Sequence, residues 1–350
     1  MTRFHRWKTR AEPRRSKGAK FVEKEITAPV DMCLPDGRLN TLAVGWSRRP
    51  VHNTELRGFP GRNKRFDYWC VASPDVVVAF SVSDIDYRSG VSTFFLDRRT
   101  GTSFSTGQAR WFRPNPTMRE PWGSRPIESR GETMDVVIEP RAGEIVLMIR
   151  SERLTVDIVV DAPDGHESMG VVVPWSGRTF QYTRKNNCMA ARGTVMADGT
   201  EYRVESASTI ATMDHGRGRW PYNTVWNWAS ASGETDGHQI GLQFGGKWTV
   251  GTPSTENSLR IDGRVEKISE ELDWSYDAGD WMAPWRIRGS RVDVTFHPEY
   301  HRHSKLDRVI LLAREDQVFG SFSGDIVSSN GETYRVQNLF GWAEEVHRRW

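Results

Sequence analysis

Hydrophobic and polar residues alternate with a period of two along several stretches of the chain. Apolar side chains occupy every second position of 154–160, and residues 292–296 repeat the pattern with Val, Val and Phe. Short apolar runs of strand length stand at 75–83 (DVVVAFSVS), 144–151 (EIVLMIRS) and 308–313 (RVILLA). Because successive side chains of a strand point to opposite faces of a sheet, this pattern predicts β-strands. No window predicts an amphipathic helix longer than about two turns.

Turn residues separate these runs at regular intervals. Asp-Gly or Asn-Gly pairs stand in PDGR (35–38), ADGT (197–200), IDGR (261–264) and SNGE (329–332). Such pairs favour tight type I′ hairpins because both residues adopt positive φ readily. Many short strands joined by glycine-containing turns predict an all-β fold of antiparallel barrels or sandwiches.

The length of 350 residues favours more than one domain. A polar break, DAPDGHES, interrupts the strand pattern at 161–168. We therefore expect a basic, disordered tail over 1–20, an N-terminal β-domain over 21–163 and a C-terminal β-domain over 164–350.

Charge is unevenly distributed. The net charge is +3, but residues 1–20 hold eight Lys or Arg against one Glu, so this tail carries +7 and the remainder −4. A solvated tail is the simple interpretation, and peripheral contact with an anionic membrane is the alternative. The body lacks a basic stripe, so no nucleic-acid partner is expected.

Segments that would direct the chain out of the cytoplasm are not evident. No apolar run approaches the ~18–20 residues that span a bilayer, and the N-terminus lacks the apolar region of a signal peptide. The three cysteines, Cys33, Cys70 and Cys188, share no CxxC spacing. They indicate reduced thiols in a cytoplasmic protein. The basic tail leaves a peripheral membrane location as the alternative.

Common cofactor and catalytic motifs are absent from the sequence. There is no GxGxxG after a strand, no GxxxxGK[ST] loop and no GxSxG elbow, so we expect no cofactor. The histidine cluster FHPEYHRH holds His297, His301 and His303, which a regular strand would place on one face. Three imidazoles can bind zinc, but this spacing matches no strong motif, and we expect an exposed polar edge without metal.

The stretch MDHGRGRWPYNTVWNWASASG (213–233) carries the densest set of functional groups. Gly216 and Gly218 predict a turn with close backbone approach rather than a regular strand. In this loop Asp214 and His215 are candidates for acid or base, and Arg217 for binding a carboxylate. The alternative is a salt-bridged loop in which Asp214 pairs with an arginine.

Tryptophan is unusually abundant, with fifteen in the chain. A strand after Pro221 would place alternate aromatic side chains on one face, where they line either a packed core or an apolar pocket. Two further segments put acids beside tryptophan: HESMGVVVPW (166–175) and GGKWTVGTPSTENSL (245–259). The candidate ligand-binding aromatics are Trp175, Trp220, Tyr222, Trp226, Trp228 and Trp248, and the further candidate acids are Glu167 and Glu256.

Several longer segments resemble the bacterial domain-of-unknown-function 2804 family. They include ESMGVVVPW (167–175), DHGRGRWPYNTVWNW (214–228), GLQFGGKWTVGTPSTENSLRIDG (241–263) and MAPWRI (282–287), and the resemblance extends over about residues 24–345. More distantly, the chain is similar to lipocalin-like proteins that include a carotenoid hydratase, hydroxyneurosporene synthase, and the AttH proteins.

These resemblances imply two calycin-like antiparallel β-domains and cofactor-free acid chemistry on a hydrophobic ligand. Within the family pattern this role falls on Asp214, His215, Trp226 and Trp228. We therefore expect a hydratase, isomerase or cyclase that acts on a terpenoid- or lipid-like substrate. A protonated Asp214 or His215 would supply the proton, and aromatic faces would stabilise developing positive charge. The alternative is a non-catalytic carrier, which needs the aromatic pocket but no acid directed into it.

Overall fold

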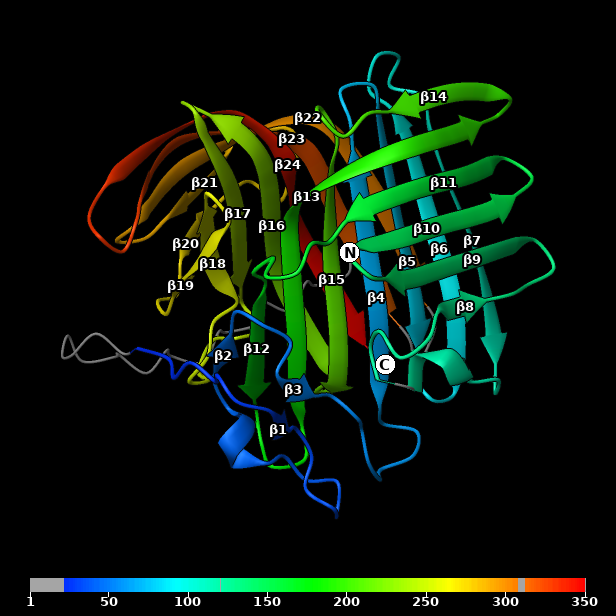
Figure 1. Ribbon diagram of the computed structural model, residues 1–350, viewed down its shortest axis with the longest axis vertical. Helices are drawn as coiled ribbons and strands as arrows, with labels where there is room; N and C mark the ends of the chain where they lie inside the picture. The colour runs from blue at the N-terminus through cyan, green and yellow to red at the C-terminus, as the bar shows by residue number, and fades with distance from the viewer. Residues whose placement is uncertain (1–21, 120, 308–311, 350) are drawn as a thin grey trace, which may run out of the picture.

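A computed structural model describes residues 22–119, 121–307 and 312–349 of the chain (Figure 1). The predicted basic tail and residues 308–311 of the run RVILLA lie outside the described residues. The described part is built almost wholly from antiparallel strands in two large curled sheets, as the sequence pattern predicts. Within it, no helix is long and apolar enough to cross a membrane.

The first sheet has thirteen strands. They are β2 (Trp46–Ser47), β4 (Lys64–Ala72), β5 (Val76–Asp84), β6 (Arg88–Asp97), β7 (Ser103–Trp111), β8 (Ile127–Ser129), β9 (Met134–Arg141), β10 (Glu144–Ser151), β11 (Leu154–Asp161), β12 (Met169–Pro174), β13 (Phe180–Ala197), β14 (Thr200–Val204) and β15 (Ile210–Arg219). Their main order is β7-β6-β5-β4-β15-β13-β11-β10-β9-β8, while β12, β14 and β2 pair alongside.

The second sheet has nine strands in the order β19-β18-β17-β16-β24-β23-β22-β21-β20. They are β16 (Asn223–Thr235), β17 (His238–Gly246), β18 (Asn257–Ile261), β19 (Arg264–Ile268), β20 (Asp273–Ser275), β21 (Trp285–Arg288), β22 (Val292–Asp307), β23 (Leu312–Val327) and β24 (Thr333–Arg349). A small parallel pair joins β1 (Val30–Asp31) to β3 (His52–Asn53), and two short 3₁₀ helices span Thr41–Ala43 and Pro116–Arg119.

Two of the four predicted type I′ turns form, whereas in PDGR (35–38) and SNGE (329–332) only the glycine has positive φ. Asp198 and Gly199 both have positive φ, 46° and 82°, and connect β13 to β14. Asp262 and Gly263, at 46° and 86°, connect β18 to β19 in the same way. The Asp-Gly pairs therefore set the register of both hairpins, as expected for type I′ turns.

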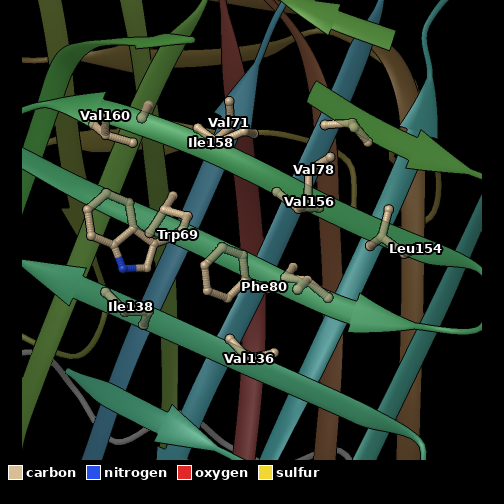
Figure 2. Close-up of a cluster of buried hydrophobic side chains, with 14 of the residues drawn as sticks. Trp69, Val71, Val78, Phe80, Val136, Ile138, Leu154, Val156, Ile158 and Val160 are labelled. Atoms are coloured by element: carbon tan, nitrogen blue, oxygen red, sulfur yellow. The ribbon is translucent and has the colours of Figure 1, made fainter. Parts of the chain in front are cut away.

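Each sheet curls around its own hydrophobic core. In the first sheet β9–β11 lie across β4–β7 (Figure 1), and their apolar side chains fill the space between the two layers. Figure 2 shows Trp69 and Phe80 from one layer beside Ile138 and Val156 from the other. The second sheet encloses a separate core. Alternation along each strand directs one set of side chains inward, which explains the period of two in the sequence.

The change from one sheet to the other lies at residues 220–222, between β15 and β16. The polar break at 161–168 lies instead within the first sheet, where it connects β11 to β12. Strands β12, β13 and β15 pair with the N-terminal strands β2, β11 and β4, so hydrogen bonding assigns them to the first sheet and not to a unit that begins at 164.

The prediction of a loop over residues 214–219 is wrong, because they belong to the regular strand β15. Its glycines serve close packing rather than a turn. A Cβ atom on Gly216 would stand 2.2 Å from the Phe66 ring, and one on Gly218 would stand 2.3 Å from the Phe180 carbonyl oxygen. Glycine in a strand is favoured where another group approaches the backbone this closely.

Candidate functional site

A cavity of about 410 Å³ lies between the two sheets. Its walls come from β4, β5, β6, β13 and β15 on one side and from β16, β22, β23 and β24 on the other. Two residues of the β17–β18 connection, Trp248 and Glu256, complete the lining. The cavity therefore depends on both curled sheets and on segments from both halves of the chain.

A buried ionic cluster lines one part of this cavity. Lys185 and Asp214 are paired neighbours on β13 and β15, and Lys185 Nζ lies 2.7 Å from Asp214 Oδ2. The same nitrogen lies 3.3 Å from Glu256 Oε2 and 3.8 Å from the centroid of the Trp228 ring. Thr183 Oγ1 donates to the other Asp214 oxygen at 2.7 Å. One ammonium thus joins two carboxylates beneath an indole face.

Burial and charge have opposite effects within this cluster. Burial lowers the pKa of Lys185, but the neighbouring Asp214 and Glu256 carboxylates outweigh it and leave that pKa above its usual value. Burial raises the pKa of Glu256, and the positive charge of Lys185 offsets this only in part. Trp248 Nε1 donates to Glu256 Oε1, while Oε2 receives no hydrogen bond from the described residues. The Lys185 ammonium is therefore the charged neighbour of Glu256 Oε2.

Glu344 on β24 brings a further carboxyl group to the cavity from the second sheet. Trp226 Nε1 donates to its Oε1 and Gln317 Nε2 to its Oε2, each at 3.1 Å. Burial, followed by the negative charge of Glu315, raises the pKa of Glu344 to about 8. This carboxyl group is consequently protonated near neutral pH. Glu344 is not among the residues expected from the sequence, although alternation in FGWAEEV places it on the face of Trp342 and Val346.

Four of the six predicted aromatic residues line the cavity: Trp220, Trp226, Trp228 and Trp248. Trp220 and Trp248 stack with ring centroids 5.3 Å apart and an interplanar angle of 17°. Trp175 lies behind them, and its Nε1 donates to the Trp248 carbonyl at 3.0 Å. It packs against the wall without lining the cavity, and Tyr222 is 44% exposed.

His215 and Arg217 lie on the other face of β15 and form a separate buried cluster with Asp67. Asp67 Oδ1 is 2.7 Å from His215 Nδ1, and Asp67 Oδ2 accepts from Arg217 Nη2 at 2.8 Å. Burial, reinforced by the charge of Arg217, lowers the pKa of His215 to about 4, so the imidazole is neutral and its Nδ1–H donates to Asp67. Successive residues of a strand face opposite sides, so neither shares the cavity with Asp214.

Glu167 lies apart from the cavity as well. Its Oε2 accepts from Arg48 Nη1 at 3.2 Å and from the backbone N–H of Val265 at 2.7 Å. These contacts join the β11–β12 connection to the start of β19. Among the four candidate acids and bases from the sequence, the structure thus brings Asp214 and Glu256 together and leaves His215 and Glu167 elsewhere.

Two of the three clustered histidines meet at Asp316. His301 Nε2 and His303 Nδ1 lie 3.0 Å and 2.7 Å from Asp316 Oδ1, and Arg314 Nε lies 2.8 Å from Oδ2. The three ligand atoms lie within 4.8 Å of one another, a spacing compatible with a metal ion. His297 lies outside this group because a β-bulge between Pro298 and Tyr300 shifts the register.

The histidine group also faces away from the cavity. Its strand neighbours Arg302 and Ser304 on β22, and Glu315 on β23, are the residues that line the cavity. Since adjacent strand residues alternate between faces, any metal held by His301, His303 and Asp316 would be separated from the ionic cluster by the sheet.

The fold and cavity together define an all-β protein of two curled half-barrels with a buried acid–base site between them. A search of solved structures found the same fold in kievitone hydratase from Nectria haematococca, with 12% identity, a TM-score of 0.53, and coverage of 92% of this chain and 98% of that one. A putative AttH protein from Nitrosomonas europaea aligns over 85% of this chain and 98% of its own, with 12% identity and a TM-score of 0.49. At this level of identity the likeness concerns the fold alone.

A family model described as a domain of unknown function, DUF2804, matches residues 23–350, and the chain belongs to this family. The resemblance seen in the sequence is thereby confirmed. A search of curated proteins found no match.

Proposed function

We propose that the protein is a cofactor-independent acid–base enzyme that hydrates, isomerises or cyclises a carbon–carbon double bond of a hydrophobic, terpenoid- or lipid-like substrate. The observation that carries this proposal is the pairing of opposite proton-transfer roles in one cavity. Glu344 is a protonated carboxyl group near neutral pH, and Asp214 is a carboxylate held beside Lys185. An acid and a base in one cavity are what proton transfer to and from carbon requires.

The reaction balances with these groups alone. Glu344 gives its proton to one alkene carbon, which leaves positive charge on the other. In a hydration, water attacks that carbon and loses a proton to Asp214 or Glu256. In an isomerisation, a neighbouring carbon loses the proton instead. The base then releases its proton to solvent and Glu344 takes up a proton from solvent, which restores both groups without any redox partner.

The tryptophans supply the remaining part of the mechanism. Trp226 and Trp228 line the cavity, and attraction between an indole face and a cation contributes ~0.5–2 kcal/mol each. This attraction acts on the charged transition state more than on the neutral alkene, so it lowers the barrier rather than merely retaining the substrate.

The alternative function is that of a non-catalytic carrier of hydrophobic ligands. The aromatic wall alone suits either role, but buried charges stabilise a fold poorly compared with apolar side chains of similar size. A carrier gains nothing from the buried cluster of Lys185, Asp214 and Glu256 in its cavity, whereas an acid–base enzyme uses it. This contrast favours the enzyme.

The test is incorporation of deuterium into carbon. The protein is incubated in ²H₂O with a panel of unsaturated terpenoids and fatty acids, and recovered compounds are analysed by mass spectrometry. We expect product with carbon-bound deuterium, and loss of that label in Glu344→Gln and Asp214→Asn while ligand retention persists. Glu234→Gln, which changes an exposed acid on β16, is the matched control. Retention of ligand without any label in the unaltered protein would identify a carrier.

A further inference from the structure

Positively charged side chains gather at the end of the cavity away from Lys185. The whole lining contains seven Lys or Arg side chains and four Asp or Glu side chains. Arg88 from β6 and Arg348 from β24 approach this end from the two different sheets, and Lys64 and Arg349 line it as well. The excess of positive charge indicates a ligand that carries negative charge.

Protein carboxylates neutralise Arg348 in part, and none of those in the described residues pairs with Arg88. Glu315 serves two arginines, since its oxygens lie 2.9 Å from Arg348 Nη2 and 3.2 Å from Arg302 Nη1. Arg88 makes no ion pair within the described ranges, and its guanidinium carbon lies 5.9 Å from the centroid of the Trp111 ring. Burial lowers the pKa of Arg88, and the positive charge of Arg348 lowers it further.

Arg88 and Arg348 repel each other in one cavity, and the Glu315 carboxylate pairs with Arg348 but not with Arg88. An anionic group placed there would receive charge-assisted hydrogen bonds from both, in the geometry that guanidinium offers to carboxylate and phosphate. The end of the cavity is therefore suited to the anionic group of a ligand rather than to its apolar part.

Strand geometry gives the distance from this end to the acid–base groups. Glu344 and Arg348 lie four residues apart on β24, which corresponds to about 13 Å at ~3.3 Å per residue. Both line the cavity, and the residue midway between them, Val346, does so too. Phe66 and Ile85 from the first sheet add apolar surface to the same region.

We propose that the protein binds an amphipathic anion, with a carboxylate or phosphate group between Arg88 and Arg348 and an apolar, unsaturated body that extends about 13 Å toward Trp228 and Glu344. The position of the reacting bond rests on the proposed function, but the binding of the anion does not. The substrate class thereby narrows from hydrophobic compounds in general to terpenoid- or lipid-like acids and phosphates.

The test compares three probes with the same apolar body: farnesoic acid, farnesyl phosphate and farnesol. Isothermal titration calorimetry should give an affinity at least tenfold higher for one or both anions than for farnesol, as expected for hydrogen bonds to charged groups. The better anion identifies carboxylate or phosphate as the natural group. Equal affinities for all three probes would overturn the proposal.

Variants locate the site. Arg88→Gln should remove most of the preference for the anion and leave the affinity for farnesol unchanged, and Arg348→Gln should do the same. The Arg88 variant is easier to interpret than the Arg348 variant, because Arg348→Gln would also leave Glu315 without one of its ion-pair partners. Arg203→Gln, on a side chain that is 83% exposed, is the control. Equal weakening of all three probes in Arg88→Gln would contradict the proposed site.

The two proposals fail separately. In Asp214→Asn the preference for the anion should persist, since Asp214 lies at the other end of the cavity. Anion preference without deuterium incorporation in the unaltered protein would uphold this binding site and reject the enzymatic function. Deuterium incorporation into neutral compounds alone would uphold the enzymatic function and reject the anion-binding site.

Discussion

Replacement of Lys185 by methionine tests the ionic cluster without any knowledge of the substrate. Methionine keeps the apolar stem but removes the ammonium, which leaves Asp214 and Glu256 buried side by side. The side chains of these three residues are only 5%, 9% and 2% exposed, so water screens them little. Loss of one partner of a buried ion pair costs ~3–5 kcal/mol, and we expect the free energy of unfolding to fall by about this amount near neutral pH.

The stability lost in Lys185→Met should depend on pH, and the shifted pKa of Glu256 gives the direction of that dependence. Without Lys185, the pKa of Glu256 rises further above its usual value, because the ammonium lowers that pKa more than any other neighbour does. A carboxyl whose pKa is raised by folding stays protonated in the folded state, so its stability penalty is small in acid and grows as pH rises above the unfolded value of ~4.3. The deficit of Lys185→Met should therefore be smaller at about pH 5 than at about pH 8.

The assay is urea unfolding followed by tryptophan fluorescence at both pH values. Lys305→Met, on an exposed side chain of β22, is the control and should leave the free energy of unfolding unchanged at both pH values. In the double variant Lys185→Met with Glu256→Gln, part of the lost stability should return, because one stranded carboxyl is removed. If Lys185→Met were as stable as the unaltered protein, or lost more stability in acid, the assignment of a charged Lys185 between two carboxylates would be refuted.

Two further predictions concern the packing around β15. Asp67→Asn should lower the free energy of unfolding by ~3–5 kcal/mol, because Arg217 would remain buried without its carboxylate; a loss below about 1 kcal/mol in urea unfolding would contradict this. Gly216→Ala should cost ~1–3 kcal/mol, because its Cβ would overlap the Phe66 ring. Gly177→Ala, with no atom within 4 Å of the added Cβ, is the control, and equal stability of the two variants would speak against close packing at 216.

Local patterns in the sequence predicted the class of fold because they act within single strands and hairpins. The Asp198–Gly199 and Asp262–Gly263 turns form where the sequence indicates them, since positive φ is a property of those residues. The strand β15 was missed because glycine has two uses. It can free the backbone for a turn, or it can make room for a neighbour such as Phe66, and only the neighbour distinguishes the two.

The site was predicted in part for a related reason. Asp214, Glu256 and the four cavity tryptophans were selected because acids and indoles stand close together in the sequence. Lys185 and Glu344 were missed because the contacts that make them notable are distant along the chain. Glu344 meets Trp226 across 118 positions, and Lys185 meets Asp214 across 29.

The expectation of a loop at β15 also obscured the distribution of its side chains. Strand alternation within DHGRGR places Asp214 on one face and both His215 and Arg217 on the other. The sequence thus carries the signal that these groups face different environments. An irregular backbone does not alternate in this way, so the signal is lost when a turn is assumed.

The apolar contact between the two sheets bears on how the chain folds during synthesis. Cys70, Val77, Ala79, Phe94 and Leu96 of the first sheet are buried against Trp228, Phe319 and Trp342 of the second. The ribosome completes β15 before it makes any strand of the second sheet, so this face of the first sheet lacks its cover while more than a hundred residues are added. Non-local strand pairing folds slowly, and apolar surface left open in the meantime promotes association between nascent chains. A chaperone that shields the β4–β6 surface would therefore raise the yield of folded protein more than one that acts after release.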